Sequence, residues 1–172
     1  MKRHIGVKLV DAREMTRGRY NDYRGWDIPE GENSDDTGFL VEYLDGGEPN
    51  HSQHKGYISW SPTTVFINSY RPTDGLNFGL AIEAMKLGKK VAREGWNGKD
   101  MFIYMDPGSE VPAAKLKSFV LRHLNPDSPS SAITILPHID MWTTNAHGRR
   151  GICVGWLASQ TDMLSDDWFI VE

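Results

Sequence analysis

Two segments far apart in the sequence each place a tryptophan beside glycine and hydrogen-bonding side chains. The first, residues 93–98, reads Arg-Glu-Gly-Trp-Asn-Gly, and the second, residues 155–163, reads Gly-Trp-Leu-Ala-Ser-Gln-Thr-Asp-Met. Stacking of a nucleobase on an aromatic side chain contributes about 1–3 kcal/mol of binding free energy per base. Amide, hydroxyl and carboxylate side chains can form hydrogen bonds with the hydroxyls of the attached sugar. Stacking on Trp96 and Trp156 would therefore bind a nucleotide without any catalytic group. Taken singly, each tryptophan is also explained as a core residue.

Residue patterns typical of catalysis or of metal binding are weak in this sequence. His51 and His54 lie three apart in a predicted loop, but no carboxylate or thiolate accompanies them at metal-ligand spacing. Residues 88–90, Gly-Lys-Lys, lack the earlier glycine and the following hydroxyl residue of a phosphate-binding loop. Asp162, Asp166 and Asp167 could hold a metal, but the simpler interpretation is that Asp162 caps a turn and the other two face solvent. The sequence has no Gly-x-Ser-x-Gly motif of a serine hydrolase. The sequence therefore predicts a binding protein with no catalytic residue, metal or cofactor.

The composition is that of a globular protein with no general affinity for nucleic-acid polymers or membranes. The 172 residues are 39% hydrophobic with a formal net charge of -4, whereas binding to a nucleic-acid backbone needs a basic face. No apolar run approaches the roughly 18 residues that span a bilayer, and the start lacks the apolar stretch of a secretory signal, so a cytoplasmic location is expected. The lone Cys153 is expected to be a small buried apolar side chain.

The first tryptophan segment follows a helix with a clear start signal. Apolar residues recur at helical spacing between 78 and 87, and Asn77 is a good N-cap, so a helix is predicted there. A β-hairpin is predicted next, with strands at 91–93 and 101–105 and a two-residue turn at Asn97-Gly98. Helix, strand, turn and strand together indicate an α+β domain.

The rest of the chain supplies further strands on either side of this unit. Residues 1–72 predict a small β-rich module, with a short helix within 16–24 and a helix after Ser61-Pro62. Its antiparallel strands are expected at 5–10, 39–44 and 57–60. Later elements are predicted as a helix over 112–124 and strands over 132–136, 139–143, 152–156 and 168–171. Ser159 and Asp162 form a capping pair that predicts one helical turn. The predicted fold class is α+β: an antiparallel sheet with packed helices over 76–172, preceded by the β-rich module.

Three stretches, residues 77–85, 88–99 and 155–168, resemble the phage Thoeris anti-defence family, second type, and the similarity covers residues 76–172. The resemblance implies a sponge in the host bacterial cytoplasm that sequesters a cyclic ADP-ribose-type signal, made by a bacterial TIR enzyme, without degrading it. It also implies homo-oligomers, typically tetramers, with ligand pockets at subunit contacts. In some members it implies a second site for cyclic dinucleotides of CBASS-type signalling.

Carried over residue by residue, the resemblance implies a set of ligand-binding side chains in the helix and in the two tryptophan segments. These candidates are Phe78, Arg93, Trp96, Asn97, Gly98, Trp156, Ser159, Gln160, Asp162 and Met163. The helical insert over 112–124 is longer than in compact members of the family, and the module over 1–72 precedes the domain without an assigned function.

The sequence leaves three functions open. In the first, a binder of a cyclic nucleotide signal, the two tryptophan segments stack the bases, and Arg93 and nearby lysines offset phosphate charge. The ribose hydroxyls are contacted by Asn97, Ser159, Gln160 and Asp162. In the second, an enzyme hydrolyses such a nucleotide with a carboxylate such as Asp162 and a histidine or a metal. In the third, a structural or host-interaction protein acts through its N-terminal module, and both tryptophans belong to the core.

Overall fold

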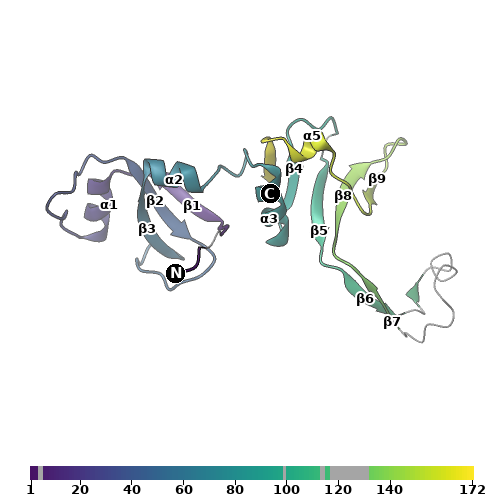
Figure 1. The fold of residues 1–172 in the computed structure, drawn as a ribbon, viewed down its shortest axis with the longest axis horizontal. Helices are drawn as coiled ribbons and strands as arrows, with labels where there is room; N and C mark the ends of the chain where they lie inside the picture. The colour runs from purple at the N-terminus through teal and green to yellow at the C-terminus, as the bar shows by residue number, and fades with distance from the viewer. Residues whose placement is uncertain (4–5, 99, 113–114, 117–131) are drawn as a thin grey trace. The chain divides into compact units, whose positions relative to one another are not determined.

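The computed structural model describes residues 1–3, 6–98, 100–112, 115–116 and 132–172. The chain forms two compact units, Met1–Arg71 and Pro72–Glu172 (Figure 1). Both contain helices and antiparallel strands, which confirms the predicted α+β class. Every helix in the described part of the chain is too short or too polar to cross a bilayer.

The N-terminal unit is a three-stranded antiparallel sheet with two short helices. The strands, in the spatial order β1-β2-β3, are β1 (Val10–Glu14), β2 (Gly38–Tyr43) and β3 (Tyr57–Pro62). The helices are α1 (Arg17–Arg24), which was predicted, and α2 (Thr63–Ser69). Tyr20, Leu40 and Ile58 form its buried cluster. The cluster joins α1 to β2 and β3, because Tyr20 comes from α1, Leu40 from β2 and Ile58 from β3.

Two predictions for this unit are wrong in detail. The first strand is Val10–Glu14 instead of 5–10, because pairing with β2 sets Val10 opposite Tyr43 and Glu14 opposite Phe39. The apolar alternation before Val10 therefore does not decide where this edge strand lies. The helix after β3 begins at Thr63, with Pro62 as N-cap and without a capping side chain.

The C-terminal unit is built on a five-stranded antiparallel sheet of spatial order β10-β4-β5-β8-β9 (Figure 1). Its strands are β4 (Lys90–Arg93), β5 (Phe102–Asp106), β8 (His138–Thr144), β9 (Arg150–Cys153) and β10 (Trp168–Val171). A separate two-stranded ribbon is formed by β6 (Ser109–Pro112) and β7 (Ala132–Ile135). The short helix α5 (Gln160–Met163) lies between β9 and β10 in the chain.

The helix α3 (Phe78–Lys86) covers the core of this unit as predicted. The side chain of its N-cap Asn77 accepts a hydrogen bond from the Leu80 N–H at 3.0 Å, which satisfies one of the free amides of the first turn. Its buried face packs on the fully buried Val91, Ile103 and Trp168.

Three predictions for the C-terminal unit fail where tertiary contacts override local signals. Residues 94–101 separate β4 from β5, and neither Asn97 nor Gly98 has the positive φ that a two-residue hairpin turn needs. This longer loop forms because the Gly95 N–H donates to Asp167 and Trp96 packs on the core. Pro112 ends β6 instead of beginning a helix, and most of the predicted helix 112–124 lies outside the described residues. Cys153 is exposed, because β9 is an edge strand.

Candidate functional site

Arg93, the last residue of β4, lies at the centre of a network of ion pairs. Its Nη1 donates to Asp162 Oδ1 and its Nε donates to Asp167 Oδ1, both at 2.8 Å. The Arg93 and Asp162 side chains are only 10% and 13% exposed, so their charge-assisted hydrogen bond is largely shielded from water. The bond from Arg93 lowers the pKa of Asp167, and Asp167 in turn raises the pKa of Arg93. The guanidinium is therefore neutralised inside the protein and ties α5 and β10 to β4.

Asp162 links this network to α5. Its Oδ2 accepts from the N–H of Ser159 at 3.0 Å, and its own N–H donates to Ser159 Oγ at 3.1 Å, which completes the predicted capping box. Asp162 Oδ2 also accepts from the Ser159 hydroxyl at 2.6 Å. Its Oδ1 also accepts from Trp96 Nε1 at 3.1 Å. Burial alone would raise the pKa of Asp162, but hydrogen bonds from Ser159, Arg93 and Trp96 lower it to about 2. Both carboxylate oxygens are thus occupied by donors, and the group is ionised at neutral pH.

Four aromatic rings pack together next to this network, namely those of Phe78, Trp96, Trp156 and Trp168. The centroid of the fully buried Trp168 ring lies 5.3 Å from Trp96, 5.4 Å from Phe78 and 6.2 Å from Trp156. The rings of Trp96 and Trp156 are themselves 6.0 Å apart and inclined at 64°. The two tryptophan segments therefore meet within one chain, through edge contacts around Trp168. Trp96 and Trp156 remain partly exposed.

A cavity of about 480 Å³ lies beside β4 and β5. Val91 and Ile103 face the core under α3, and side chains alternate along a strand, so Ala92 and Phe102 point to the opposite face of the sheet. The cavity is lined by Ala92, Arg93, Glu94, Trp96, Gly98, Asp100, Met101, Phe102, Trp142, Arg150, Phe169 and Val171. A volume of this size accommodates a small-molecule ligand, for which pockets of about 300–1,000 Å³ are usual.

The chemistry of this cavity is an aromatic floor with cations near its edge. Phe102 and Trp142 are partners on β5 and β8, with ring centroids 6.2 Å apart and planes only 18° from parallel. Lys90 Nζ lies 5.2 Å from the centroid of Phe102. At the rim, the exposed Arg150 donates from Nη2 to Asp100 Oδ2 at 2.6 Å. Flat rings accept a stacked base, and a guanidinium recognises phosphate oxygens.

The ligand-binding residues expected from the sequence fall into four groups in the structure. Arg93, Trp96 and Gly98 line the cavity. Phe78 and Trp156 belong to the aromatic cluster around Trp168. Ser159 and Asp162 form the capping box, while Asn97, Gln160 and Met163 are exposed. Contact of these residues with a ligand stays a prediction.

The sequence reasoning missed several residues that make up most of the cavity floor, namely Phe102, Trp142 and Phe169, together with Arg150 at the rim. The alternation of side chains along the two strands could have indicated Phe102 and Trp142, because each strand carries an aromatic residue at a position that points away from the core. Only the pairing register shows that the two rings lie opposite each other.

Asp140 of β8 belongs to a second group of polar side chains in this unit. It is buried, and its Oδ1 accepts from the Gly155 N–H at 3.1 Å, so it fixes the start of the second tryptophan segment. His138 Nε2 lies 3.4 Å from the same oxygen, and a hydrogen bond from His138 Nδ1 to the Leu136 carbonyl raises the pKa of His138. Within the described residues, Asp106, His138 and Asp140 are the one trio of metal-type side chains with ligand atoms within 4.8 Å of one another. Asp106 Oδ1 accepts from the Gly108 N–H at 2.7 Å, so part of its hydrogen bonding is local.

Comparison with known proteins finds similarity over the C-terminal unit. The model of a family described as the Thoeris anti-defense 2-like domain matches residues 76–171. Thoeris anti-defense 2 of Bacillus phage SP01 is 32% identical over 97 residues, which cover 56% of this chain and 96% of that relative. The matched segment contains α3, the ion-pair network, the aromatic cluster and the cavity, whereas the N-terminal unit lies outside it.

Proposed function

The chain belongs to the Thoeris anti-defense 2-like family through residues 76–171, and from this premise we propose that it serves phage anti-defence by binding a cyclic nucleotide immune signal and holding it uncleaved. Family membership supports the anti-defence role itself. The nature of the ligand is the proposed part: a cyclic ADP-ribose-type signal of a TIR enzyme, encountered in the host bacterial cytoplasm, with a cyclic dinucleotide as a second ligand.

The observation that carries this proposal is the cavity of about 480 Å³ with its aromatic floor. The nearly parallel Phe102 and Trp142 rings offer a surface on which a purine can stack, and stacking contributes about 1–3 kcal/mol per base. Arg150 also lines the cavity, and a guanidinium is suited to bind the phosphate of a nucleotide. These groups recognise a nucleotide and perform no chemistry on it.

The carboxylate that a hydrolase would use is not suited to that role. A general base works best when its pKa lies near the operating pH, whereas the pKa of Asp162 is lowered to about 2. Its two oxygens are also occupied by donors from Ser159, Arg93 and Trp96. This engagement supports sequestration over hydrolysis and gives Asp162 a positioning role.

Assembly into a homo-oligomer, with a tetramer as the expected form, is part of the proposal. Several large apolar side chains near β9 and α5 are strongly exposed in the single chain: Ile152 by 52%, Val154 by 71%, Leu157 by 89% and Leu164 by 81%. Apolar surface concentrated in one segment is typical of a subunit contact. A second copy of the chain would bury it and place the cavity near the contact.

The decisive experiment separates binding from cleavage. The protein is incubated with a cyclic ADP-ribose-type signal, washed by gel filtration and heat-denatured, and the released compound is identified by chromatography and mass spectrometry. Intact signal supports sequestration, an altered product would establish the hydrolase, and no retained compound would favour a structural or host-interaction protein. The Trp142→Ala variant should lose retention, whereas Trp26→Ala, which changes an exposed tryptophan of the N-terminal unit, should keep it.

A further inference from the structure

The two edge strands of the N-terminal sheet differ in how their free backbone groups are treated. This unit lies outside the family-matched residues, and its strands follow the order β1-β2-β3, so β1 and β3 are the edges. An uncovered edge presents backbone N–H and C=O groups that can pair with another strand. The hydrogen bonds on each edge therefore show which one can accept a partner.

The edge at β3 is closed by a side chain and a proline. Asn50, in the loop between β2 and β3, donates from Nδ2 to the Ile58 carbonyl at 2.9 Å, and its Oδ1 accepts from the Ile58 N–H at 2.8 Å. A strand added at this edge would have to break both hydrogen bonds. Pro62, the last residue of β3, has no N–H, and proline is one means by which proteins protect a sheet edge.

The edge at β1 is open. Among the described residues β1 pairs with β2 alone, and the ladder continues just past its end, where the Met15 N–H donates to the Gly38 carbonyl at 2.9 Å. Backbone groups of an antiparallel strand point alternately toward its partner and away from it. Since the Met15 N–H points toward β2, the backbone groups that point outward are those of Val10, Ala12 and Glu14. Ala12 is exposed, so this edge is accessible in the part of the chain that the structure describes.

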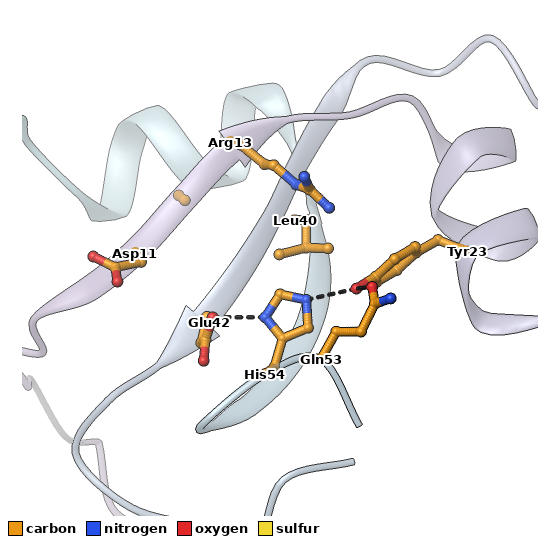
Figure 2. Close-up of a pocket in the computed structure, with 8 residues that line it drawn as sticks. Asp11, Arg13, Tyr23, Leu40, Glu42, Gln53 and His54 are labelled. Carbon is orange, nitrogen blue, oxygen red and sulfur yellow. Dashed lines mark hydrogen bonds and ion pairs between the residues drawn. The ribbon is translucent and has the colours of Figure 1, made fainter. Parts of the chain in front are cut away.

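The open strand carries opposite charges two residues apart. Asp11 and Arg13 lie on the same face of the sheet, because side chains alternate along a strand, and both line a cavity of about 360 Å³ over that face (Figure 2). Both residues are exposed. The Arg13 guanidinium lies 5.6 Å from the centroid of the Tyr23 ring, and a cation–π contact at an exposed site is weak. Arg13 can therefore exchange this contact for an ion pair with a partner.

We infer that β1 pairs with β1 of a second copy of this chain, antiparallel and about a two-fold axis at Ala12. In this register Ala12 lies opposite the partner's Ala12 and Val10 lies opposite the partner's Glu14, so the outward backbone groups exchange hydrogen bonds. Asp11 lies opposite the partner's Arg13, and Arg13 lies opposite the partner's Asp11. The surface is thus complementary to itself, as a two-fold contact requires. The two three-stranded sheets join into one.

Charge favours this register over its neighbours. Pairing centred on Glu14 would set two carboxylates opposite each other. Pairing centred on Asp11 or on Arg13 would also oppose like charges, and it would need backbone groups that already bind β2. In the register centred on Ala12, the two ion pairs occupy the non-hydrogen-bonded positions, where facing side chains approach most closely. A charged edge resists most added strands, but these charges fit a strand of the same sequence.

Sedimentation equilibrium of the full-length chain at low ionic strength measures this pairing. Every sample carries Leu164→Asp, so that the proposed contact near β9 and α5 does not contribute; the inferred contact is independent of it and of nucleotide binding. We expect a monomer–dimer equilibrium. Asp11→Arg and Arg13→Asp should each weaken it at least tenfold, because each replaces two ion pairs by two contacts between like charges. The double variant Asp11→Arg/Arg13→Asp restores both ion pairs with the charges exchanged, so it should regain the original affinity.

Two further variants make the test specific. Asp22→Arg makes the same change of charge at an exposed position of α1 and should leave the association unchanged. Ala12→Pro removes an N–H that β2 does not use, so the chain should stay folded by circular dichroism while the dimer is lost.

A chain that stays monomeric at every concentration would overturn the inference and show that the charges protect this edge. Failure of the double variant to regain association would overturn it as well. If the Leu164→Asp chain still exceeds the mass of a dimer, the inference requires that adding Asp11→Arg lowers this mass, and an unchanged mass would refute it.

Discussion

The substitution Asp162→Asn tests whether one carboxylate holds the C-terminal unit together. Asparagine has nearly the same shape but loses the charge that pairs with Arg93. The pKa of Asp162 falls from 3.8 to about 2 in the folded protein, which corresponds to roughly 2.5 kcal/mol of extra stability at neutral pH. We therefore expect Asp162→Asn to lower the free energy of unfolding by about 2–3 kcal/mol at pH 7.

The lowered pKa of Asp162 also predicts how the stability difference between the wild-type protein and the variant changes with pH. Because the folded pKa lies below the unfolded value of 3.8, the stabilisation is complete well above that value and is lost as the pH falls toward 2. About half of the difference in unfolding free energy between the wild-type protein and the Asp162→Asn variant should remain at pH 3. Urea unfolding followed by tryptophan fluorescence at pH 7 and pH 3 measures both quantities.

The control for this experiment is Asp166→Asn, an exposed aspartate of the same turn. It should change the free energy of unfolding by less than about 0.5 kcal/mol, as is usual for a surface site. A wild-type-like stability of Asp162→Asn at pH 7 would refute the reasoning. A large deficit that did not shrink between pH 7 and pH 3 would also refute it, because the loss would then have a cause other than charge.

Further predictions concern the cavity rim, the helix cap and the assembly. Arg150→Gln should weaken binding of the nucleotide signal roughly tenfold and reduce the salt dependence of binding in calorimetric titrations. The neighbouring Arg149→Gln should change neither quantity, and an equal loss of affinity in both variants would show that Arg150 does not contact the ligand. Asn77→Ala removes the cap of α3 and should cost about 1 kcal/mol of unfolding free energy in urea, and no measurable cost would show that the cap is dispensable. Leu164→Asp places a charge on the exposed apolar segment and should dissociate the proposed oligomer in light-scattering measurements, whereas a mass equal to that of the wild-type oligomer would place the contact elsewhere.

The sequence by itself determined the features that depend on residues close in the chain. The cap at Asn77 and the capping box of Ser159 with Asp162 formed as predicted, because each joins groups three residues apart. The strands 39–44 and 57–60 were also found, because their residues suit a half-buried sheet. The α+β class follows from these local elements.

Only the tertiary structure decided which distant side chains meet. Arg93 reaches Asp162 across 69 positions of the chain, and Phe102 faces Trp142 through the register of β5 and β8. The two-residue turn predicted at Asn97-Gly98 gave way to a longer loop, because Trp96 gains more from packing against the core than the turn gains locally. The conformation of such a loop depends on the total free energy of many long-range contacts, and this total cannot be read from the spacing of residues along the chain.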